Sequence, residues 1–503
     1  MGSGKGRDGR VGGPGQPGET VPAAQVCDDA AKVRVVRRGE SGQSAEPTHP
    51  DASRTSRRTT YALFAVLVTA TLLGNLGQTS LNAMMTSMIA DFGVEVELGQ
   101  WVTTIYMLVL GMAVPLSCFL WRRLGNRAYT MLLLALFLTG ALIDFAATGL
   151  GAMVIGRVLQ ACATGLATPA MQDVAMSGFP PERRGAAMGV AGVAIGFAPN
   201  IGPTIGALFA DGAGWRWFFA MVAATIAALM AVTLAMVRDD AAGDAGAGFD
   251  FASFAICAIG FGGLLTGCSE ASSYGLASPA VWAPMAVGAA FLAIFVWRQR
   301  RVANPLVHMQ IFGNHQYRAG FWMMNFLFAS FMGITLVLSL YIEDVLDGSA
   351  MDAGLALLPG ALVALVCNPL LGSLGDRVGK GRVICIGSVV LAAGALLALT
   401  LGEDSPLWYV AFCQAVRCLG ISVLGCAIAW LLDDLPTEYV GDGTTFSILV
   451  RQASASMGTA VMVFLMTALA GVGDAMLPYR SALGFSTLMS VLFMAMSLAC
   501  ARD

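Results

Sequence analysis

The sequence predicts an all-α integral membrane protein with about fourteen transmembrane helices, arranged as two pseudo-symmetric six-helix bundles plus two inserted central helices. Three observations lead to this fold class. First, 56% of the 503 residues are hydrophobic and only 12% are charged, whereas a soluble domain carries roughly 25% charged residues. Second, long apolar runs recur along the chain, whose mean hydropathy is +0.71. Third, motifs of the first half return in the second half.

The composition also argues against several functions. The formal net charge of -3 leaves no broad basic surface of the kind that binds nucleic acid. The 11 cysteines form no CxxC pair and no cluster with the 3 histidines, so no metal site is expected. The sequence shows no nucleophile–base pair and no nucleotide-binding loop. We therefore expect neither an enzyme nor a resident cofactor.

Residues 1–59 differ in composition from the rest of the chain. They contain no Leu, Ile, Phe, Trp or Tyr and are rich in Gly, Pro, Arg and Asp. Such a segment has too little apolar surface to bury. We expect it to be a disordered cytoplasmic tail.

The transmembrane segments follow from the apolar runs, because a helix that crosses a bilayer needs about 20 mostly apolar residues. Runs that qualify begin near Tyr61, Trp101, Ala128, Ala152, Gly185, Trp215, Phe251, Val281, Gly320, Gly354, Val383, Leu407, Thr444 and Ser481. They place the first bundle at residues 60–237, a linker with two extra helices at 238–316, and the second bundle at 317–503.

The basic residues predict the orientation, since cytoplasmic loops carry an excess of Lys and Arg. With the N-terminus in the cytoplasm, only Arg216 and Arg480 lie on the outer side, whereas the other basic loop residues after the tail face inward. We therefore expect a multi-pass protein of the cell (inner or plasma) membrane with both termini in the cytoplasm.

An internal repeat relates the two bundles. The segment from Pro115 to Gly125 matches that from Pro369 to Gly379, and the pair Arg157 and Asp173 matches Arg417 and Asp433. A third match joins the segments that begin at Phe179 and Leu435. All three matches lie about 250–260 residues apart. Duplicated bundles around a site near the bilayer midplane are typical of alternating-access carriers.

Four motifs point to one family. The loop before Val383 carries Gly372, Leu374, Asp376, Arg377, Gly379, Lys380 and Arg382, and the fourth span carries Arg157-Val-Leu-Gln160. The fifth span carries Gly196, Pro199, Gly202, Pro203 and Gly206, and the thirteenth carries Arg451-Gln452 with Gly458. In this order, the motifs resemble those of the major facilitator superfamily, specifically its fourteen-span drug:proton antiporter branch (EmrB/QacA-like). Within that branch the chain is most similar to the lincomycin-resistance-like exporters, and the resemblance covers essentially everything from residue 61 onward.

The resemblance implies a secondary active transporter that exports small amphipathic compounds (drugs, antibiotics or metabolites) in exchange for protons, driven by the proton gradient. Its partners would be the lipid bilayer, the small-molecule substrate and protons. In an envelope with two membranes, a periplasmic adaptor and an outer-membrane channel are candidate partners. A uniporter, a narrow-substrate metabolite exporter without proton coupling and a non-transporting membrane sensor are the alternatives. The duplicated bundles and gate motifs disfavour the sensor.

Charges inside the predicted spans are candidate transport and coupling residues, because a buried charge in a membrane is costly and usually functional. They are Arg157, Asp144, Arg417 and Arg451. The alternative for Arg157 is that it holds its helix to neighbouring carbonyls. Asp144 lies near the outer end of the third span, which in this family tends to be peripheral. The branch usually has an acid on the first span, whereas this chain has Gly77 there.

Two helix faces are candidates for the substrate cavity. The first span carries a polar stripe of Asn75, Gln78, Thr79, Asn82 and Thr86, which should face a cavity or another helix. The ninth span carries Phe321, Asn325, Phe328 and Met332 on one face, which suits either a tolerant apolar pocket or ordinary packing. On the fifth span, the antiporter-motif residues Gly196, Pro199, Gly202, Pro203 and Gly206 should allow close helix contact and bending.

A cytoplasmic gate is implied by the loop motifs. In the family, the loop acid, a loop base and the acid that closes the fourth or twelfth span form a charge cluster. The candidate gate residues are Arg122, Arg123, Asp173, Asp376, Arg377, Lys380 and Asp433. The first loop has Arg122 where the family has the acid, so we hypothesise that Arg122 pairs directly with Asp173. The alternative is that these are solvated helix-end charges, each worth under about 1 kcal/mol.

Overall fold

The computed structural model describes Gly2 and residues 50–94, 96–237, 250–274, 278–302, 307–436, 439–469 and 475–501. Within these ranges, every regular element is a helix. The chain divides into two units, Met1–Asp51 and Ala52–Asp503. The predicted disorder of residues 1–49 lies outside the described residues, apart from Gly2. The first helix begins at Pro50, before the expected start of the first bundle at residue 60.

The first half of the larger unit contains six α-helices and a short 3-10 helix among the described residues. They are α1 (Pro50–Phe92), α2 (Val96–Phe145), α3 (Leu150–Ser177), η1 (Pro181–Arg183), α4 (Arg184–Gly196), α5 (Ala198–Asp211) and α6 (Trp215–Met236). The long helix α2 contains two predicted spans, which meet at Gly125, where φ is 74°. One predicted span is divided into α4 and α5, which meet at an angle of 41°. Pro199 and Pro203 follow this break, as expected for residues that interrupt helical hydrogen bonding.

The second half has the same kind of helical order. After α7 (Phe251–Tyr274), α8 (Pro279–Gln299) and η2 (Met309–Gly313) come α9 (His315–Asp344), α10 (Ala350–Val378), α11 (Lys380–Ala398), α12 (Leu407–Ile421), α13 (Leu424–Asp433), α14 (Val440–Leu469) and α15 (Leu477–Cys500). The predicted span that begins at Leu407 is divided into α12 and α13. The extra helices are tied together where Arg298 at the end of α8 donates to Asp250, just before α7, at 3.0 Å.

Every predicted span coincides with a helix, but not every helix is long enough to count as a span by itself. In the described ranges, eleven helices are long and apolar enough to cross a membrane, or twelve if α4 and α5 form one bent span. The two remaining predicted spans coincide with shorter apolar stretches, Val102–Ser117 and Phe251–Gly267. The multi-pass helical fold is therefore confirmed, whereas the number fourteen is not reached by this criterion.

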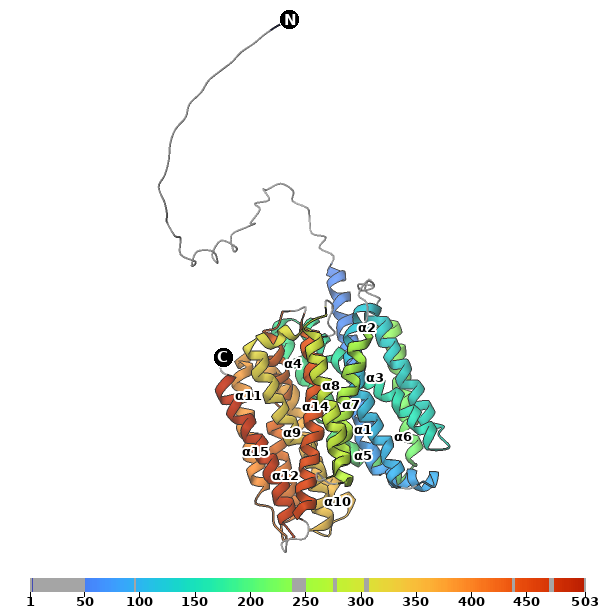
Figure 1. Cartoon of the computed structure of the whole chain (residues 1–503), viewed down its shortest axis with the longest axis vertical. Helices are drawn as coiled ribbons and strands as arrows, with labels where there is room; N and C mark the ends of the chain where they lie inside the picture. The colour runs from blue at the N-terminus through green and yellow to red at the C-terminus, as the bar shows by residue number, and fades with distance from the viewer. Residues whose placement is uncertain are drawn as a thin grey trace, which may run out of the picture. The chain divides into compact units, whose positions relative to one another are not determined.

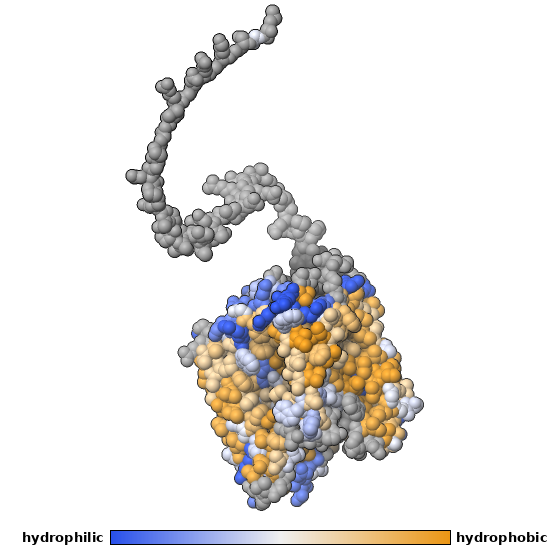
Figure 2. Space-filling view, viewed as in Figure 1, coloured by the Kyte–Doolittle hydropathy of each residue, from blue (hydrophilic) through white to orange (hydrophobic). Residues whose placement is uncertain are grey.

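The two halves of the larger unit lie side by side (Figure 1). Helix α7 contacts both α2 of the first half and α14 of the second, so the extra helices bridge the halves along one side. A second contact runs between α4 and α5 of the first half and α10 of the second, with α13 also against α4. The side surface is apolar and the polar residues gather toward the ends (Figure 2). Large side chains such as Trp408 (70% exposed) and Ile386 (66% exposed) lie on the outside, as expected for a surface that faces lipid.

Glycines allow the close contact between α4, α10 and α13. A Cβ atom on Gly372 would overlap the carbonyl oxygen of Gly185, and one on Gly189 would lie 2.5 Å from the carbonyl oxygen of Asn368. Likewise, a Cβ on Gly425 would lie 2.6 Å from the Cα of Gly189. Small residues at helix contacts let backbones approach closely in membranes. We call Gly185, Gly189, Gly372 and Gly425 the glycine seam.

Candidate functional site

A chain of polar contacts is buried inside the first half, where α3 faces the second part of α2. Arg157 and Gln160 lie one turn apart on α3, and Nη1 of Arg157 donates to Oε1 of Gln160 at 3.0 Å. Nε2 of Gln160 then donates to Oδ2 of Asp144 at 2.7 Å. The exposed fractions are 0% for Asp144 and Arg157 and 2% for Gln160. A single amide therefore links Arg157 and Asp144, two of the predicted coupling residues.

Arg157 is also held from two other helices. Its Nη2 donates to the carbonyl oxygen of Gly77 on α1 at 3.2 Å. Its Cζ lies 4.0 Å from the centre of the Tyr106 ring, within the range of a cation–π interaction. The Tyr106 hydroxyl donates to the Gly74 carbonyl oxygen and bonds to the Thr164 hydroxyl, each at 2.8 Å. Arg157 thus joins α1, the first part of α2, and α3.

Gln160 belongs to the motif of the fourth span, but no role was predicted for it or for Tyr106. The spacing of Gln160 could have placed it beside Arg157, because residues three apart share a face of a helix. Tyr106 gave no such signal, since a tyrosine in an apolar span is usually a packing residue. The third span, expected to be peripheral, exposes Leu142 and Phe145, and its Asp144 side chain is buried against α3.

The polar stripe on α1 is only partly described. Asn75 donates to the carbonyl oxygen of Ala194 on α4 at 2.9 Å, and the Gln78 side chain is half-buried. The side chain of Asn82 lies outside the described residues. Asn75 therefore contributes to helix–helix contact, the alternative that the sequence left open. A role of this stripe in a substrate cavity stays a prediction.

Arg417, the repeat counterpart of Arg157, has a different environment. It is 1% exposed, and its Nη2 donates to the carbonyl oxygen of Ser330 at 3.3 Å and to the hydroxyl of Ser486 at 3.1 Å. Its Nε and Nη1 have no hydrogen-bond partner in the described part of the chain. No carboxylate among the described residues is paired with Arg417, in contrast to the Asp144 link of Arg157.

Arg451 on α14 is a third buried guanidinium. It is 4% exposed, and its Cζ lies 4.6 Å from the centre of the Phe328 ring on α9. Across the ranges that the structure describes, no side-chain or backbone oxygen accepts a hydrogen bond from it, and no carboxylate pairs with it. Arg451 is therefore a buried cation whose only polar contact there is an aromatic face.

The predicted apolar face of α9 packs against α14. Phe321 stacks with Phe446 at a centroid distance of 5.8 Å, and Asn325 Oδ1 accepts from Ser454 at 2.8 Å. Met332 is partly buried against the same core. Together with the Phe328–Arg451 contact, these interactions bring the predicted α9 residues to one interface. The structure shows packing here, and a pocket for substrate stays a prediction.

Asp376 joins the two halves at the predicted cytoplasmic end. Its Oδ1 accepts from the backbone N–H of Gly185 at 2.7 Å, and its Oδ2 accepts from that of Ala186 at 2.8 Å. These N–H groups belong to the first turn of α4, whose helix dipole favours a negative charge. The carboxylate at the end of α10 therefore caps a helix of the opposite half.

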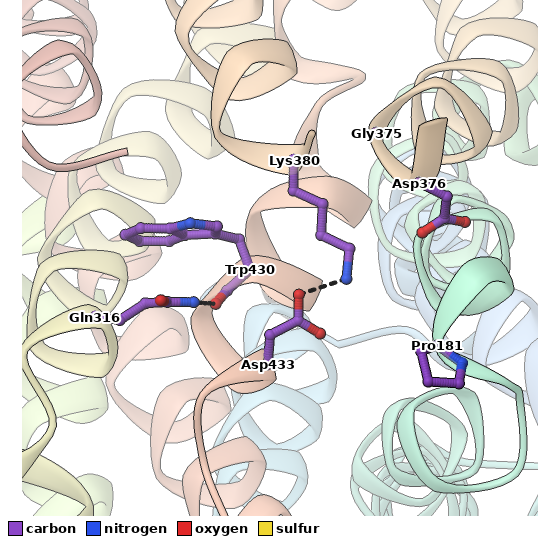
Figure 3. Close-up of a pocket in the computed structure, with 7 residues that line it drawn as sticks. All are labelled: Pro181, Gln316, Gly375, Asp376, Lys380, Trp430 and Asp433. Atoms are coloured by element: carbon purple, nitrogen blue, oxygen red, sulfur yellow. Dashed lines mark hydrogen bonds and ion pairs between the residues drawn. The ribbon is translucent and has the colours of Figure 1, made fainter. Parts of the chain in front are cut away.

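The other second-half gate residues lie beside Asp376. Lys380 and Asp433 form an ion pair, and both line a cavity of about 350 Å³ together with Pro181, Gln316, Gly375, Asp376 and Trp430. In Figure 3, Lys380 points toward Asp433, with Asp376 and Pro181 on one side of this pair and Gln316 and Trp430 on the other. The predicted residues are thus brought together. Lys380 pairs with Asp433, however, while Asp376 bonds to the N-terminus of α4.

The first-half gate residues are less completely described. Asp173 is half-buried near the end of α3, whereas Arg123 and Arg377 are exposed. The guanidinium carbon of Arg123 lies 5.8 Å from the centre of the Phe119 ring. The side chain of Arg122 lies outside the described residues, so its pairing with Asp173 stays a prediction.

The antiporter-motif residues hold α5 against α1. A Cβ on Gly202 would overlap the Thr79 hydroxyl, and a Cβ on Gly206 would overlap the Ser80 carbonyl oxygen. At Gly196 the nearest atom would be 3.9 Å away, an ordinary contact distance. Two of the three motif glycines are therefore required by close helix contact, and Gly196 lies next to the break between α4 and α5.

A charged clasp closes the opposite end of the first half. Asp91, beyond the membrane-spanning part of α1, accepts from the Trp215 indole at 2.9 Å and from Arg216 at 2.7 Å. The hydrogen bond from Trp215, followed by that from Arg216, lowers the pKa of Asp91 below its usual value. Arg216 also donates to the Ala147 carbonyl oxygen at 3.2 Å, so the clasp joins α1, α6 and the end of α2.

Comparisons of sequence identify one family. The sequence model of the Major Facilitator Superfamily matches residues 67–459. The lincomycin resistance protein LmrB of Listeria monocytogenes is 30% identical over 415 residues, which cover 81% of this chain and 86% of that protein. The uncharacterized MFS-type transporter YcnB of Bacillus subtilis is 29% identical, over 80% of this chain and 86% of that protein. The multidrug export protein EmrB of Haemophilus influenzae is 23% identical, with 80% of each chain covered.

Solved structures show the same fold. The proton:xylose symporter XylE superposes with a TM-score of 0.60 at 15% identity, covering 88% of this chain and 96% of XylE. The human organic anion transporter MFSD10 superposes with a TM-score of 0.59 at 14% identity, covering 87% of this chain and 99% of MFSD10. At these identities the likeness concerns the fold alone.

Proposed function

Because this chain belongs to the major facilitator superfamily, and is thus a multi-pass membrane transporter and not an enzyme, we propose that it exports small amphipathic compounds in exchange for protons. The direction of transport and the kind of substrate are suggested by relatives whose names denote lincomycin resistance and multidrug export. We propose that the proton gradient drives the exchange without a cofactor. A uniporter and a narrow-substrate metabolite exporter remain the alternatives.

The observation that carries the proposal is the contact of Asp376 with α4. It links the halves at one end through a carboxylate and two backbone N–H groups, next to the Lys380–Asp433 pair. Alternating access requires one end of the two-bundle unit to close while the other opens. A cap made by few polar contacts can be broken and remade, which suits such a gate.

The finer topology belongs to the same proposal. We propose fourteen spans, with the bent pair α4 and α5 as one span and with Val102–Ser117 and Phe251–Gly267 as two more. The excess of basic residues in the inner loops supports both termini in the cytoplasm, and we propose that the bundles run from residue 60 to 237 and from 317 to 503. A periplasmic adaptor and an outer-membrane channel would be partners only in a two-membrane envelope.

Arg451 suggests which substrates fit. A cationic drug is usually held by a carboxylate in the transport cavity, and the described α9 and α14 residues around Arg451 contain none. A buried guanidinium beside aromatic rings instead suits an amphipathic compound with a carboxylate or another strong hydrogen-bond acceptor. We therefore propose anionic or neutral amphipaths as preferred substrates.

The test is transport by the purified protein in liposomes with an imposed pH gradient. An anionic fluorescent amphipath and the cationic dye ethidium are followed in parallel with the luminal pH. We expect movement of the anionic probe that depends on the gradient and is accompanied by opposite proton flux. Movement indifferent to the gradient would refute antiport in favour of uniport, and ethidium as the better substrate would refute the anion preference. Transport of neither probe would refute broad export.

A further inference from the structure

Asp144 is an unusual acid for its position. The other acidic residues of the predicted spans lie at helix ends near the membrane surface, whereas Asp144 lies inside a span. Its side chain is fully buried, although its neighbours Phe145 and Ala146 are exposed at the end of α2. A Cβ on Gly156 would overlap Oδ1 of Asp144, so the glycine on α3 makes room for the carboxylate. An ionisable group that is kept inside a membrane protein calls for a functional explanation.

Gln160 connects Asp144 to Arg157 in one orientation only. Its Nε2 donates to Asp144 and its Oε1 accepts from Arg157. The reverse orientation would place the amide NH2 against a guanidinium that can only donate, so the contact would be lost. The amide therefore bonds to the carboxylate and to the guanidinium at the same time. Oδ1 of Asp144 has no hydrogen-bond partner in the described chain and is open to a proton.

Helix α1 supplies no charge for Arg157. At the closest position it offers only the Gly77 carbonyl oxygen, and a Cβ on Gly77 would lie 3.6 Å from Nη1 of Arg157. A carboxylate at position 77 would thus pair with Arg157 directly. Because position 77 has no carboxylate, the negative charge that balances Arg157 is that of Asp144 on the second part of α2, which is linked to it through Gln160.

The other groups around Asp144 leave it as the proton-binding candidate. The charged and titratable groups that act on it are Arg157 of α3 and Tyr106 of the first part of α2. From α6, Arg216 reaches the carbonyl oxygen of nearby Ala147, but its charge is held by Asp91. Arginine does not release its proton in proteins, so among these groups Asp144 is the candidate that can bind and release one.

We propose that Asp144 binds and releases the transported proton and that Arg157 responds to its charge through Gln160. The inference rests on the proposed proton-coupled export. A proton from water on the outer side bonds to a carboxylate oxygen of Asp144, which becomes neutral and no longer attracts Arg157. The guanidinium is then free to leave Gly77 and Gln160 when the halves move. Release of the same proton to water on the inner side restores the carboxylate and the tether.

The first test uses the unaltered protein. Dicyclohexylcarbodiimide, a lipophilic reagent, modifies protonated carboxyl groups in apolar surroundings, and the modified residue is identified by mass spectrometry. We expect modification of Asp144 in acidic buffer, less in alkaline buffer, and a parallel loss of gradient-driven transport. Transport that persists with no modification of Asp144 at any pH would overturn the proposal, without any question of misfolding.

The second test uses Asp144→Asn, with Glu403→Gln, an exposed acid on an outer loop, as the matched control. We expect Asp144→Asn to keep exchange of substrate for substrate across the membrane but to lose stimulation by the pH gradient. The double variant Asp144→Asn with Gly77→Asp should regain it. If Asp144→Asn keeps wild-type proton flux, the role of Asp144 is refuted while proton-coupled export stands. If the unaltered protein shows no gradient dependence, the proposed antiport itself is refuted.

Discussion

The three buried arginines differ in how their charge is balanced. Arg157 reaches a carboxylate through Gln160. In the described part of the chain, Arg417 bonds only to neutral serine oxygens, and Arg451 lies over an aromatic ring. A charge buried without a partner is expensive, and removing it can be neutral or stabilising. A site that keeps such a charge therefore keeps it at some cost in stability, which favours a role in transport over a role in folding.

This contrast gives a prediction for Arg451→Met. The substitution removes an unpaired buried charge and loses a cation–π contact worth about 0.5–2 kcal/mol. We expect the melting temperature of the detergent-solubilised protein to stay the same or rise, while transport of an anionic probe falls at least about tenfold, or about 1.4 kcal/mol in free energy. Thermal unfolding and liposome flux measure the two effects. Unchanged anion transport would show that Arg451 does not contact the substrate.

A second prediction concerns Asp91 and pH. Because its pKa is lowered in the folded protein, the clasp stabilises the fold above the usual aspartate pKa of about 3.9 and loses this effect as the pH falls through the folded value. The side chains of Arg216 and Asp91 are 40% and 46% exposed, so the contribution is under about 1 kcal/mol. Asp91→Asn should lower the melting temperature slightly at neutral pH but not in strong acid. An equal decrease at both pH values would contradict the ionic account.

At the scale of helices, contact between α1 and α5 depends on glycine. Gly202 lies against the Thr79 hydroxyl with no room for a Cβ, whereas Gly196 has an ordinary distance of 3.9 Å to its nearest neighbour. Alanine is favoured over glycine inside a helix by about 1 kcal/mol. The same substitution should therefore have opposite effects at the two positions.

We predict that Gly202→Ala destabilises the protein by about 1–3 kcal/mol, the usual cost of overpacking. Gly196→Ala, the matched control, should leave stability unchanged or raise it slightly. Thermal unfolding in detergent compares the two variants, and the double variant Gly202→Ala with Thr79→Ala should recover part of the loss. Equal effects of Gly202→Ala and Gly196→Ala would show that the break after Gly196, and not the contact with α1, is the sensitive feature.

At the scale of the whole molecule, Asp376 links the halves. Asp376→Asn keeps the size of the side chain but removes the charge at the N-terminus of α4, an interaction worth about 0.3–2 kcal/mol. We expect the population to shift several-fold toward states open on the cytoplasmic side. Distances between spin labels on the two halves would measure the shift, with Glu403→Gln as the control. A distribution like that of the unaltered protein would mean that the glycine seam alone holds the gate.

Much of this architecture could be predicted from the sequence, because a bilayer leaves few choices to an apolar segment of about 20 residues. Segment positions and the repeat follow from local patterns, and the gathering of Lys380, Asp433 and Asp376 follows from the resemblance to the family. The link from Arg157 to Asp144 could not be predicted, because it depends on how α2 turns against α3 and on the space that Gly156 leaves. The partner of Asp376 was missed for a similar reason, since backbone N–H groups carry no sequence signal.

The glycine seam has a consequence for how this transporter can evolve. At Gly185, Gly189, Gly372 and Gly425 the space for even one methyl group is already taken, mostly by backbone of the opposite helix. A mutation there must separate the two halves, and no change in a neighbouring side chain can compensate for a clash with backbone. Between α9 and α14, Gly458 also lies against the backbone of Ala329, but the contact of Phe328 with Arg451 is made by two side chains, which can be exchanged together. Selection for a new substrate would therefore change side chains such as Phe328 and Arg451, while the glycine seam stays constant.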